Sequence, residues 1–160
     1  KYLLDFTVPK MGFIKGERAK QLIGMLIQNK RLENLQPKVS VVATNLRNGE
    51  KAIFQKGDIT TAVRASIAIP GIFVPEKIDE DYYVDGGVVD RLPVSVVKEM
   101  GADITIAVDV SYFNKNPEIN SIYDVMMQTM DIMEKEMVKY RDIETDIIVR
   151  PITKPINVYN

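Results

Sequence analysis

The chain has 160 residues, with 21 basic and 22 acidic side chains and therefore a net charge of −1. This length and a hydrophobic content of 46% are typical of one globular domain, and the near-neutral charge gives no electrostatic footprint for nucleic acid. The sequence contains no cysteine and no histidine, which excludes disulfides, thiolate or imidazole metal sites and a Ser-His-Asp triad within it. Any chemistry here must use carboxylates, hydroxyls, lysines or backbone amides.

The first part of the chain predicts one helix and one hairpin. Apolar residues from Gly16 onward recur at the i, i+3, i+4, i+7 spacing of an amphipathic helix with a single buried stripe. Those residues are Ala19, Leu22, Ile23, Leu26 and Ile27. The β-branched run at 39–43 predicts a strand covered on both faces, and Asn48-Gly49 predicts a tight turn into a strand at 52–54.

The middle of the chain predicts a short helix followed by two strands. Asp58 is a suitable N-cap for a helix over 59–68, which the following Pro-Gly pair would end. Short strands are predicted at 73–78 and 82–84, on either side of an acidic turn. The second of these strands leads directly into Asp85-Gly86-Gly87.

The last part of the chain predicts two helices and two strands. Pro93 suits the first position of a helix that ends at 100, and a buried strand follows at 104–108. A longer helix is predicted over 121–140, and a last strand at 147–149. A methionine-rich stripe on the long helix favours docking on a sheet, with an adaptable surface for acyl chains or a partner as the alternative. The stripe consists of Ile122, Met126, Met130, Met133, Met137 and Tyr140.

Buried apolar strands that alternate with amphipathic helices predict the α/β class. We expect a layered fold with a mostly parallel sheet flanked by helices, in a single domain that spans 1–160. No apolar run in the sequence reaches the length of a membrane-spanning helix.

Asp85-Gly86-Gly87 is the segment best suited to chemistry. Its carboxylate follows an apolar strand and is expected at the strand end, where sites in such folds gather. The two glycines permit close approaches that a Cβ atom would block. A carboxylate held against apolar surface has a raised pKa, which suits a general base. For the tripeptide alone, a glycine turn capped by aspartate is the structural alternative.

Further motifs occur in a fixed order around this tripeptide. They are Val41-Val42-Ala43-Thr44-Asn45-Leu46, Gly49-Glu50, Arg64-Ala65-Ser66-Ile67-Ala68-Ile69-Pro70-Gly71-Ile72-Phe73, Tyr83-Val84-Asp85-Gly86-Gly87-Val88-Val89-Asp90-Arg91-Leu92-Pro93-Val94, Gly101-Ala102-Asp103 and Ile106-Ala107-Val108-Asp109. Together they resemble the C-terminal half of bacterial patatin-like phospholipases. The resemblance covers most of the chain as far as about Ser111 and is much more specific than Asp-Gly-Gly alone.

The resemblance implies a serine acyl hydrolase that cleaves lipid or fatty-acyl esters with a Ser-Asp dyad and without histidine. Asp85 matches the family's proton acceptor, and Gly86 and Gly87 would set its position. The family's nucleophile lies in a Gly-x-Ser-x-Gly elbow, and a glycine-rich loop forms its oxyanion hole. Neither motif occurs in these 160 residues. We therefore expect that the chain starts after the part of the fold that carries the nucleophile elbow and the glycine-rich loop. We also expect that the chain lacks the nucleophile and is inactive alone.

Other serines and acids suggest different roles. Ser66 lies in a predicted helix that is followed by proline, which favours a structural role over that of a nucleophile. The acids Asp85, Asp90, Asp103 and Asp109 leave a Mg²⁺-dependent phosphotransfer enzyme as one alternative, although cap or loop roles are favoured for the last two. A non-catalytic acyl-binding or interaction module with the same fold is the other alternative.

The hydrolase hypothesis also sets expectations for ligands and surroundings. We expect no cofactor and no metal, a lipid or fatty-acyl ester as the substrate, and no nucleic acid partner. Transient contact with a membrane surface and assembly into a homo-oligomer are left open. A cytoplasmic location is expected. If parts of the fold lie outside the chain, its sheet and helices should expose apolar surface.

Overall fold

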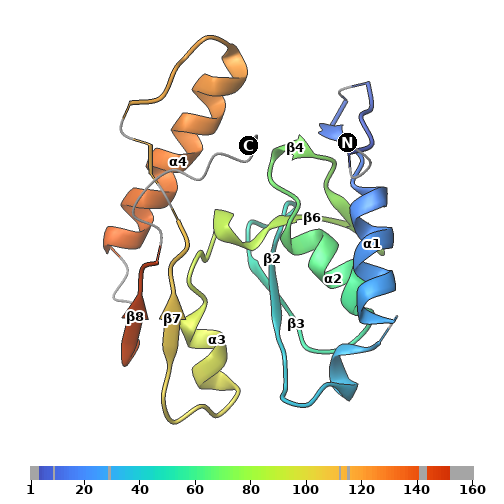
Figure 1. Cartoon of the computed structure of the whole chain (residues 1–160), viewed down its shortest axis with the longest axis vertical. Coiled ribbons are helices and arrows are strands. Elements are labelled where there is room, and N and C mark those ends of the chain that lie inside the picture. Colours follow the sequence, from blue (N-terminus) through green and yellow to red (C-terminus); the bar gives the residue numbers. More distant parts are fainter. Residues whose placement is uncertain are drawn as a thin grey trace. The chain divides into compact units, whose positions relative to one another are not determined.

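The structure is a computed structural model that describes residues 4–8, 10–28, 30–111, 113–114, 116–140 and 144–151. The chain divides into two compact units, Lys1–Asp90 and Arg91–Asn160. Each unit contains both strands and helices, which confirms the α/β class (Figure 1). The single domain expected over the whole chain stays a prediction.

The first unit begins with a short strand and ends at a one-turn helix. Its elements are β1 (Gly12–Ile14), α1 (Glu17–Ile27), the 3₁₀ helix η1 (Leu32–Asn34), β2 (Val41–Asn45), β3 (Lys51–Phe54), α2 (Ile59–Ser66), β4 (Gly71–Phe73), β5 (Glu76–Ile78), β6 (Asp81–Asp85) and the 3₁₀ helix η2 (Gly86–Val88). The second unit contains α3 (Val94–Glu99), β7 (Ile106–Val108), α4 (Ile122–Tyr140) and β8 (Ile147–Val149). Every helix predicted from the sequence is present, with ends that differ by one or two residues.

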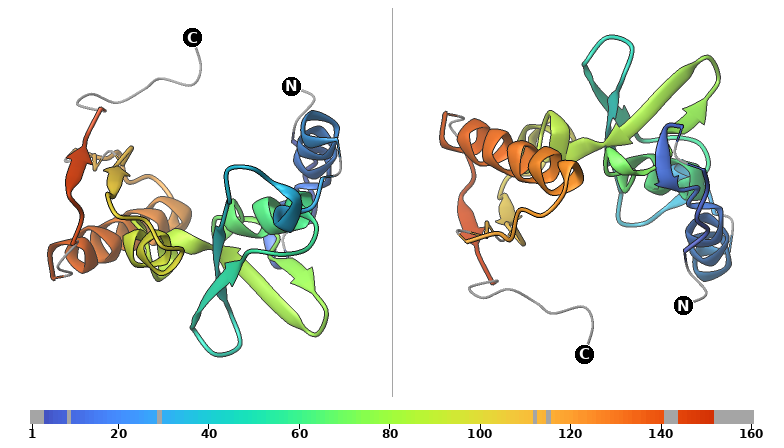
Figure 2. Two further views of the ribbon diagram at one scale, coloured as in Figure 1. Left: turned by 90° about the horizontal axis from the view of Figure 1, so that it is seen from below. Right: turned by 90° about the horizontal axis from the view of Figure 1, so that it is seen from above.

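The largest sheet lies in the first unit and is antiparallel, with the strand order β3-β2-β6-β5. The parallel pairs are β1 with β4 and β7 with β8, so the mostly parallel pairing expected from the sequence is limited to these short pairs. Tight turns join β2 to β3 and β5 to β6, and such turns impose antiparallel pairing. In Figure 2 these two hairpins diverge from the place where β2 pairs with β6.

Helix α2 forms the centre of the first unit. Asp58 caps its N-terminus as predicted, because a carboxylate oxygen of Asp58 accepts a hydrogen bond from the Thr61 N–H at 2.8 Å. The helix packs against β2 and β6, and its Ile59 and Ala62 form a buried apolar cluster with Leu32. Helix α1 lies beside α2 (Figure 1). These contacts place the start of η2 next to the core of this unit.

Arg64 of α2 is a buried cation in this core, with only 1% of its side chain exposed. Its Nη2 donates to the carbonyl oxygens of Lys15 at 2.6 Å and Val74 at 2.7 Å. The guanidinium carbon lies 5.3 Å from the centre of the Phe73 ring, and Nε lies 4.0 Å from a carboxylate oxygen of Glu76. Arg64 thus connects α2 to the segment before α1 and to the segment between β4 and β5.

Apolar residues of helix α1 and strand β7 are less buried than the sequence predicts. On α1, Leu26 is 73% exposed, whereas Ile27 packs against the core cluster. On β7, Ile106 and Val108 are exposed and Ala107 is buried. Within the described part of the chain, β7 pairs with β8 alone, so one face of this pair lacks the cover that a parallel sheet usually has.

Helix α4 contacts the rest of the second unit through a different side from the predicted methionine stripe. Arg91 Nη1 donates to Glu134 Oε2 at 2.9 Å, and Lys135 Nζ lies 4.0 Å from the centre of the Phe113 ring. Because the described members of the stripe are exposed or half-buried, they do not confirm the prediction that the stripe docks on a sheet. Its exposed members are Ile122, Met126 and Met133, and Met130 and Met137 are half-buried, while the Tyr140 side chain lies outside the described residues.

Across the residues with a described structure, no helix is both long enough and apolar enough to cross a lipid bilayer.

We expect Asp58→Ala to lower the free energy of unfolding by about 1 kcal/mol, because the first turn of α2 loses its cap. Asp58→Asn keeps an acceptor at this position and should remain close to the wild type in chemical denaturation. An unchanged free energy of unfolding in Asp58→Ala would contradict the role of Asp58 as the cap.

The stability that Asp58 contributes should also depend on pH. Burial opposes its ionisation, but the hydrogen bonds from Thr61 outweigh burial and hold the pKa of Asp58 below its ordinary value of 3.8. A carboxylate with a lowered pKa in the folded state stabilises above its unfolded pKa and loses this effect as the pH falls through the folded value. The stability difference between wild type and Asp58→Ala should therefore shrink below about pH 3.8. A difference that stays constant down to pH 2 would contradict this expectation.

Candidate functional site

Asp85 lies where β6 ends and η2 begins, and its side chain is half-buried. Its backbone N–H donates to the carbonyl oxygen of Ala68, just after α2, at 3.0 Å. Its carbonyl oxygen accepts from the Thr44 hydroxyl at 2.8 Å, and its carboxylate Oδ1 accepts from the Gly87 N–H at 2.7 Å. Groups from β2, from the end of α2 and from the turn itself therefore fix both the backbone and the side chain of Asp85.

The two glycines after Asp85 allow two different close contacts. A Cβ atom on Gly86 would lie 2.5 Å from the carbonyl oxygen of Val42, so glycine is needed for the turn to lie directly on β2. A Cβ atom on Gly87 would lie 3.1 Å from Asp85 Oδ1, which is the atom that the Gly87 N–H binds. The structure thus brings the three predicted site residues together in one tight turn.

Thr44 contacts this turn, but no pattern in the sequence identifies it as a residue of the site. It belongs to a β-branched run that is typical of any buried strand. Only the register shows its position, because Ala43 lies opposite Asp85 and Thr44 opposite Val84 in the antiparallel pairing of β2 with β6. No local pattern encodes this contact between residues 41 positions apart.

The other acids named from the sequence have local settings of their own. The carboxylate of Asp90 pairs with Lys51 Nζ at 2.8 Å, and Asp103 is exposed. In the second unit, Asp109 accepts hydrogen bonds from the N–H and hydroxyl of Ser111 and lies 3.4 Å from Arg150 Nε. Asp109 therefore closes a local turn at the end of β7.

The electrostatics of Asp109 agree with this structural role. Burial opposes its ionisation, but the bonds from Ser111 and the nearby arginines hold the pKa of Asp109 below its ordinary value. Moreover, the described residues contain no group of three or more acidic side chains arranged to hold a metal ion. Ser66 lies at the end of α2 and not at a strand-to-helix elbow. These positions give the magnesium and Ser66 alternatives no support.

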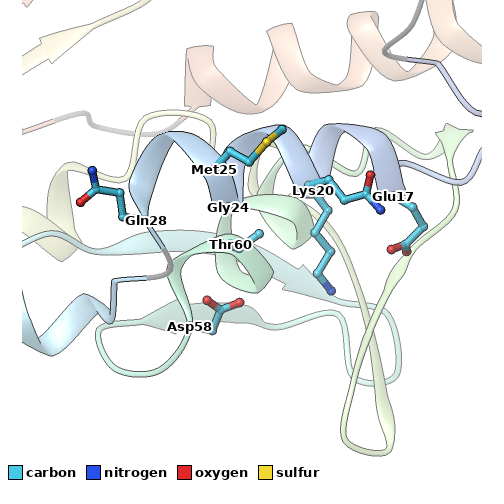
Figure 3. Close-up of a pocket in the computed structure, with 8 residues that line it drawn as sticks. Glu17, Lys20, Gly24, Met25, Gln28, Asp58 and Thr60 are labelled. Carbon is cyan, nitrogen blue, oxygen red and sulfur yellow. The ribbon is translucent and has the colours of Figure 1, made fainter.

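Each unit contains a pocket that is lined by described residues. An open groove of about 720 Å³ lies between α1 and the start of α2, where Thr60 has a buried hydroxyl without a hydrogen-bond partner among the described residues (Figure 3). It is lined by Glu17, Lys20, Gln21, Gly24, Met25, Gln28, Asp58 and Thr60. A pocket of about 210 Å³ in the second unit is lined by Arg91, Asp109, Ser111, Phe113, Asp131, Lys135, Val138 and Arg150. The Asp85 turn lines neither of them.

The Asp85 turn is a glycine turn capped by its own aspartate, and it presents the carboxylate in a fixed orientation. A general base must present its carboxylate in one orientation, and the Gly87 N–H holds Oδ1 in that way. The surrounding strand and helix leave the backbone of the turn little freedom. The site supplies a positioned carboxylate but, among the residues described, no serine nucleophile beside it.

Comparisons with known proteins agree with the resemblance seen in the sequence. The family model for patatin-like phospholipase matches residues 2–98, which include the Asp85 turn. An uncharacterised NTE family protein of Mycobacterium tuberculosis is 34% identical over 115 residues, which are 72% of this chain and 32% of that protein. Another uncharacterised NTE family protein of that species is 33% identical over 93 residues, 58% of this chain and 16% of the other.

A further relative is similar over a comparable length of the chain. Lysophospholipase NTE1 of Yarrowia lipolytica is 29% identical over 117 residues, which are 73% of this chain and 8% of that protein. The chain therefore spans about a third of the first mycobacterial relative and a much smaller part of the fungal one.

We expect Gly86→Ala to lower the free energy of unfolding by about 1–3 kcal/mol, because the new Cβ atom would collide with the backbone oxygen of Val42. Gly87→Ala is the matched control, since its Cβ atom would lie 3.1 Å from a single side-chain oxygen, a contact that a shift of a few tenths of an ångström relieves. Chemical denaturation of both variants measures the difference. Equal losses in the two variants would show that close packing on β2 does not constrain the turn.

Proposed function

Because the chain belongs to the patatin-like phospholipase family, we propose that the whole protein hydrolyses carboxylic esters of lipids, with Asp85 as the proton acceptor of a Ser-Asp dyad. The observation that carries this proposal is the orientation of the Asp85 carboxylate at a strand end by the Gly87 N–H. These 160 residues contain no histidine, so Asp85 is the candidate base that they supply. The serine and the amides of the oxyanion hole would come from parts of the protein outside these 160 residues.

The proposed reaction proceeds through an acyl-enzyme. The serine oxygen attacks the ester carbonyl carbon while Asp85 accepts the hydroxyl proton, and backbone amides bind the developing oxyanion. Collapse of the tetrahedral intermediate breaks the bond to the leaving alcohol, which takes the proton from Asp85. Water then attacks the acyl-enzyme with Asp85 again as the base, which releases a carboxylic acid and restores the serine.

The substrate class is inferred from the relatives. The similar protein from Yarrowia lipolytica is named a lysophospholipase, which makes a single-chain phospholipid the natural first substrate to test. A non-catalytic acyl-binding module would bind this lipid without releasing fatty acid. The released acid therefore distinguishes the hydrolase from the binding module.

In the whole protein, we expect Asp85→Asn to lower the turnover of a lysophospholipid by about 10²- to 10⁴-fold, because the amide cannot accept the serine proton. Asp90→Asn is the matched control, since Asp90 is a nearby carboxylate that pairs with Lys51 and should not affect turnover per folded molecule. Fatty-acid release and melting curves are measured for both variants and for the isolated 160-residue chain, which should show no turnover. Near-normal turnover by folded Asp85→Asn, or real hydrolysis by the isolated chain, would overturn the proposal.

A further inference from the structure

The hydroxyl of Thr44 donates a hydrogen bond to the backbone of Asp85. We propose that Thr44 is a positioning residue for the reaction, an inference that rests on the proposed function of Asp85. It acts on the substrate only through Asp85. Its effect is to fix the direction in which the chain leaves β6 and enters η2.

The contact is short and almost completely buried. Thr44 Oγ1 donates to the carbonyl oxygen of Asp85 at 2.8 Å, and Thr44 is only 3% exposed. Thr44 lies directly opposite Val84, so its hydroxyl reaches along the strand to the next carbonyl. Water has little access to a site this deeply buried, so the hydrogen bond has no ready substitute when the hydroxyl is removed.

The geometry of the turn explains why this bond controls the carboxylate. The bound oxygen belongs to the rigid peptide plane between Asp85 and Gly86, so holding it also sets where the Gly86 N–H points. Gly86 rests against the Val42 carbonyl, and the next residue, Gly87, donates its N–H to Asp85 Oδ1. A tilt of the peptide plane between Asp85 and Gly86 therefore changes the direction of the Asp85 carboxylate.

The opposite side of Asp85 is held independently. The Asp85 N–H donates to the Ala68 carbonyl oxygen at 3.0 Å, which fixes the preceding peptide plane to the end of α2. Loss of the Thr44 hydroxyl should thus leave β6 in place and free only the plane that leads into the turn. This separation predicts a larger effect on turnover than on folding.

The test uses the whole protein and three variants. Thr44→Val keeps the shape of the side chain without the hydroxyl, and Thr44→Ser keeps the hydroxyl. Thr60→Val is the matched control, because Thr60 is another buried threonine of the same unit whose hydroxyl has no hydrogen-bond partner among the described residues. Turnover of a lysophospholipid is measured as kcat and KM per folded molecule, together with melting curves.

We expect Thr44→Val to lower kcat by about tenfold, the effect of losing one hydrogen bond that is worth more in the transition state, with KM unchanged. Thr44→Ser should recover most of kcat, and Thr60→Val should keep it. A threonine with only a structural role would lower the melting temperature and the folded fraction without changing kcat per folded molecule. That result in Thr44→Val would overturn the inference.

Two further comparisons distinguish a failure of the inference on Thr44 from a failure of the proposed function. If Thr44→Val does not fold, Thr44→Ser is compared with Thr44→Ala, which differ in the hydroxyl alone, and equal kcat values would overturn the inference. Full turnover in Asp85→Asn would overturn the proposed function itself. An inactive Asp85→Asn protein together with an unaffected Thr44→Val protein would leave the proposed function standing and reject the role of Thr44.

Discussion

A guanidinium buried among backbone carbonyls determines how the first unit is assembled. Arg64 projects from α2 and binds the carbonyl oxygens of Lys15 and Val74, so one side chain joins segments far apart in the sequence. The residue after Lys15 must be small, because a Cβ atom on Gly16 would lie 2.3 Å from Arg64 Nε. A buried cation is costly unless such groups compensate for the lost water, so these contacts and the position of α2 depend on each other.

The position of α2 in turn determines the surroundings of Asp85. The carbonyl of Ala68 just beyond α2 holds the Asp85 N–H, and strand β2, against which α2 packs, carries Thr44 and Val42 beneath the turn. The orientation of the carboxylate therefore results from the packing of one helix on one antiparallel sheet. Both of these supports of the turn lie within the first unit.

Features that depend on neighbouring residues could be predicted from the sequence, whereas features that depend on distant contacts could not. The cap at Asp58 and the hairpin at Asn48-Gly49 follow from local backbone chemistry, and both are present in the structure. The burial of Arg64 and the contact of Thr44 with Asp85 depend on strand register and helix packing, which no short pattern encodes. The apolar stripe of α4 predicted a docked face, whereas its described side chains are exposed or half-buried. The catalytic role of Asp85 stays a prediction.

The orientation of α4 has a chemical consequence for its methionines. Met126 and Met133 are 56% and 58% exposed, so dissolved oxidants can reach their thioether sulfurs directly. Oxidation converts a flexible apolar side chain into a polar, chiral sulfoxide, which methionine sulfoxide reductases can reverse. The contact of Arg91 with Glu134 involves neither sulfur. Oxidation by peroxide would thus make this apolar face of the helix polar, while the contact between Arg91 and Glu134 remains.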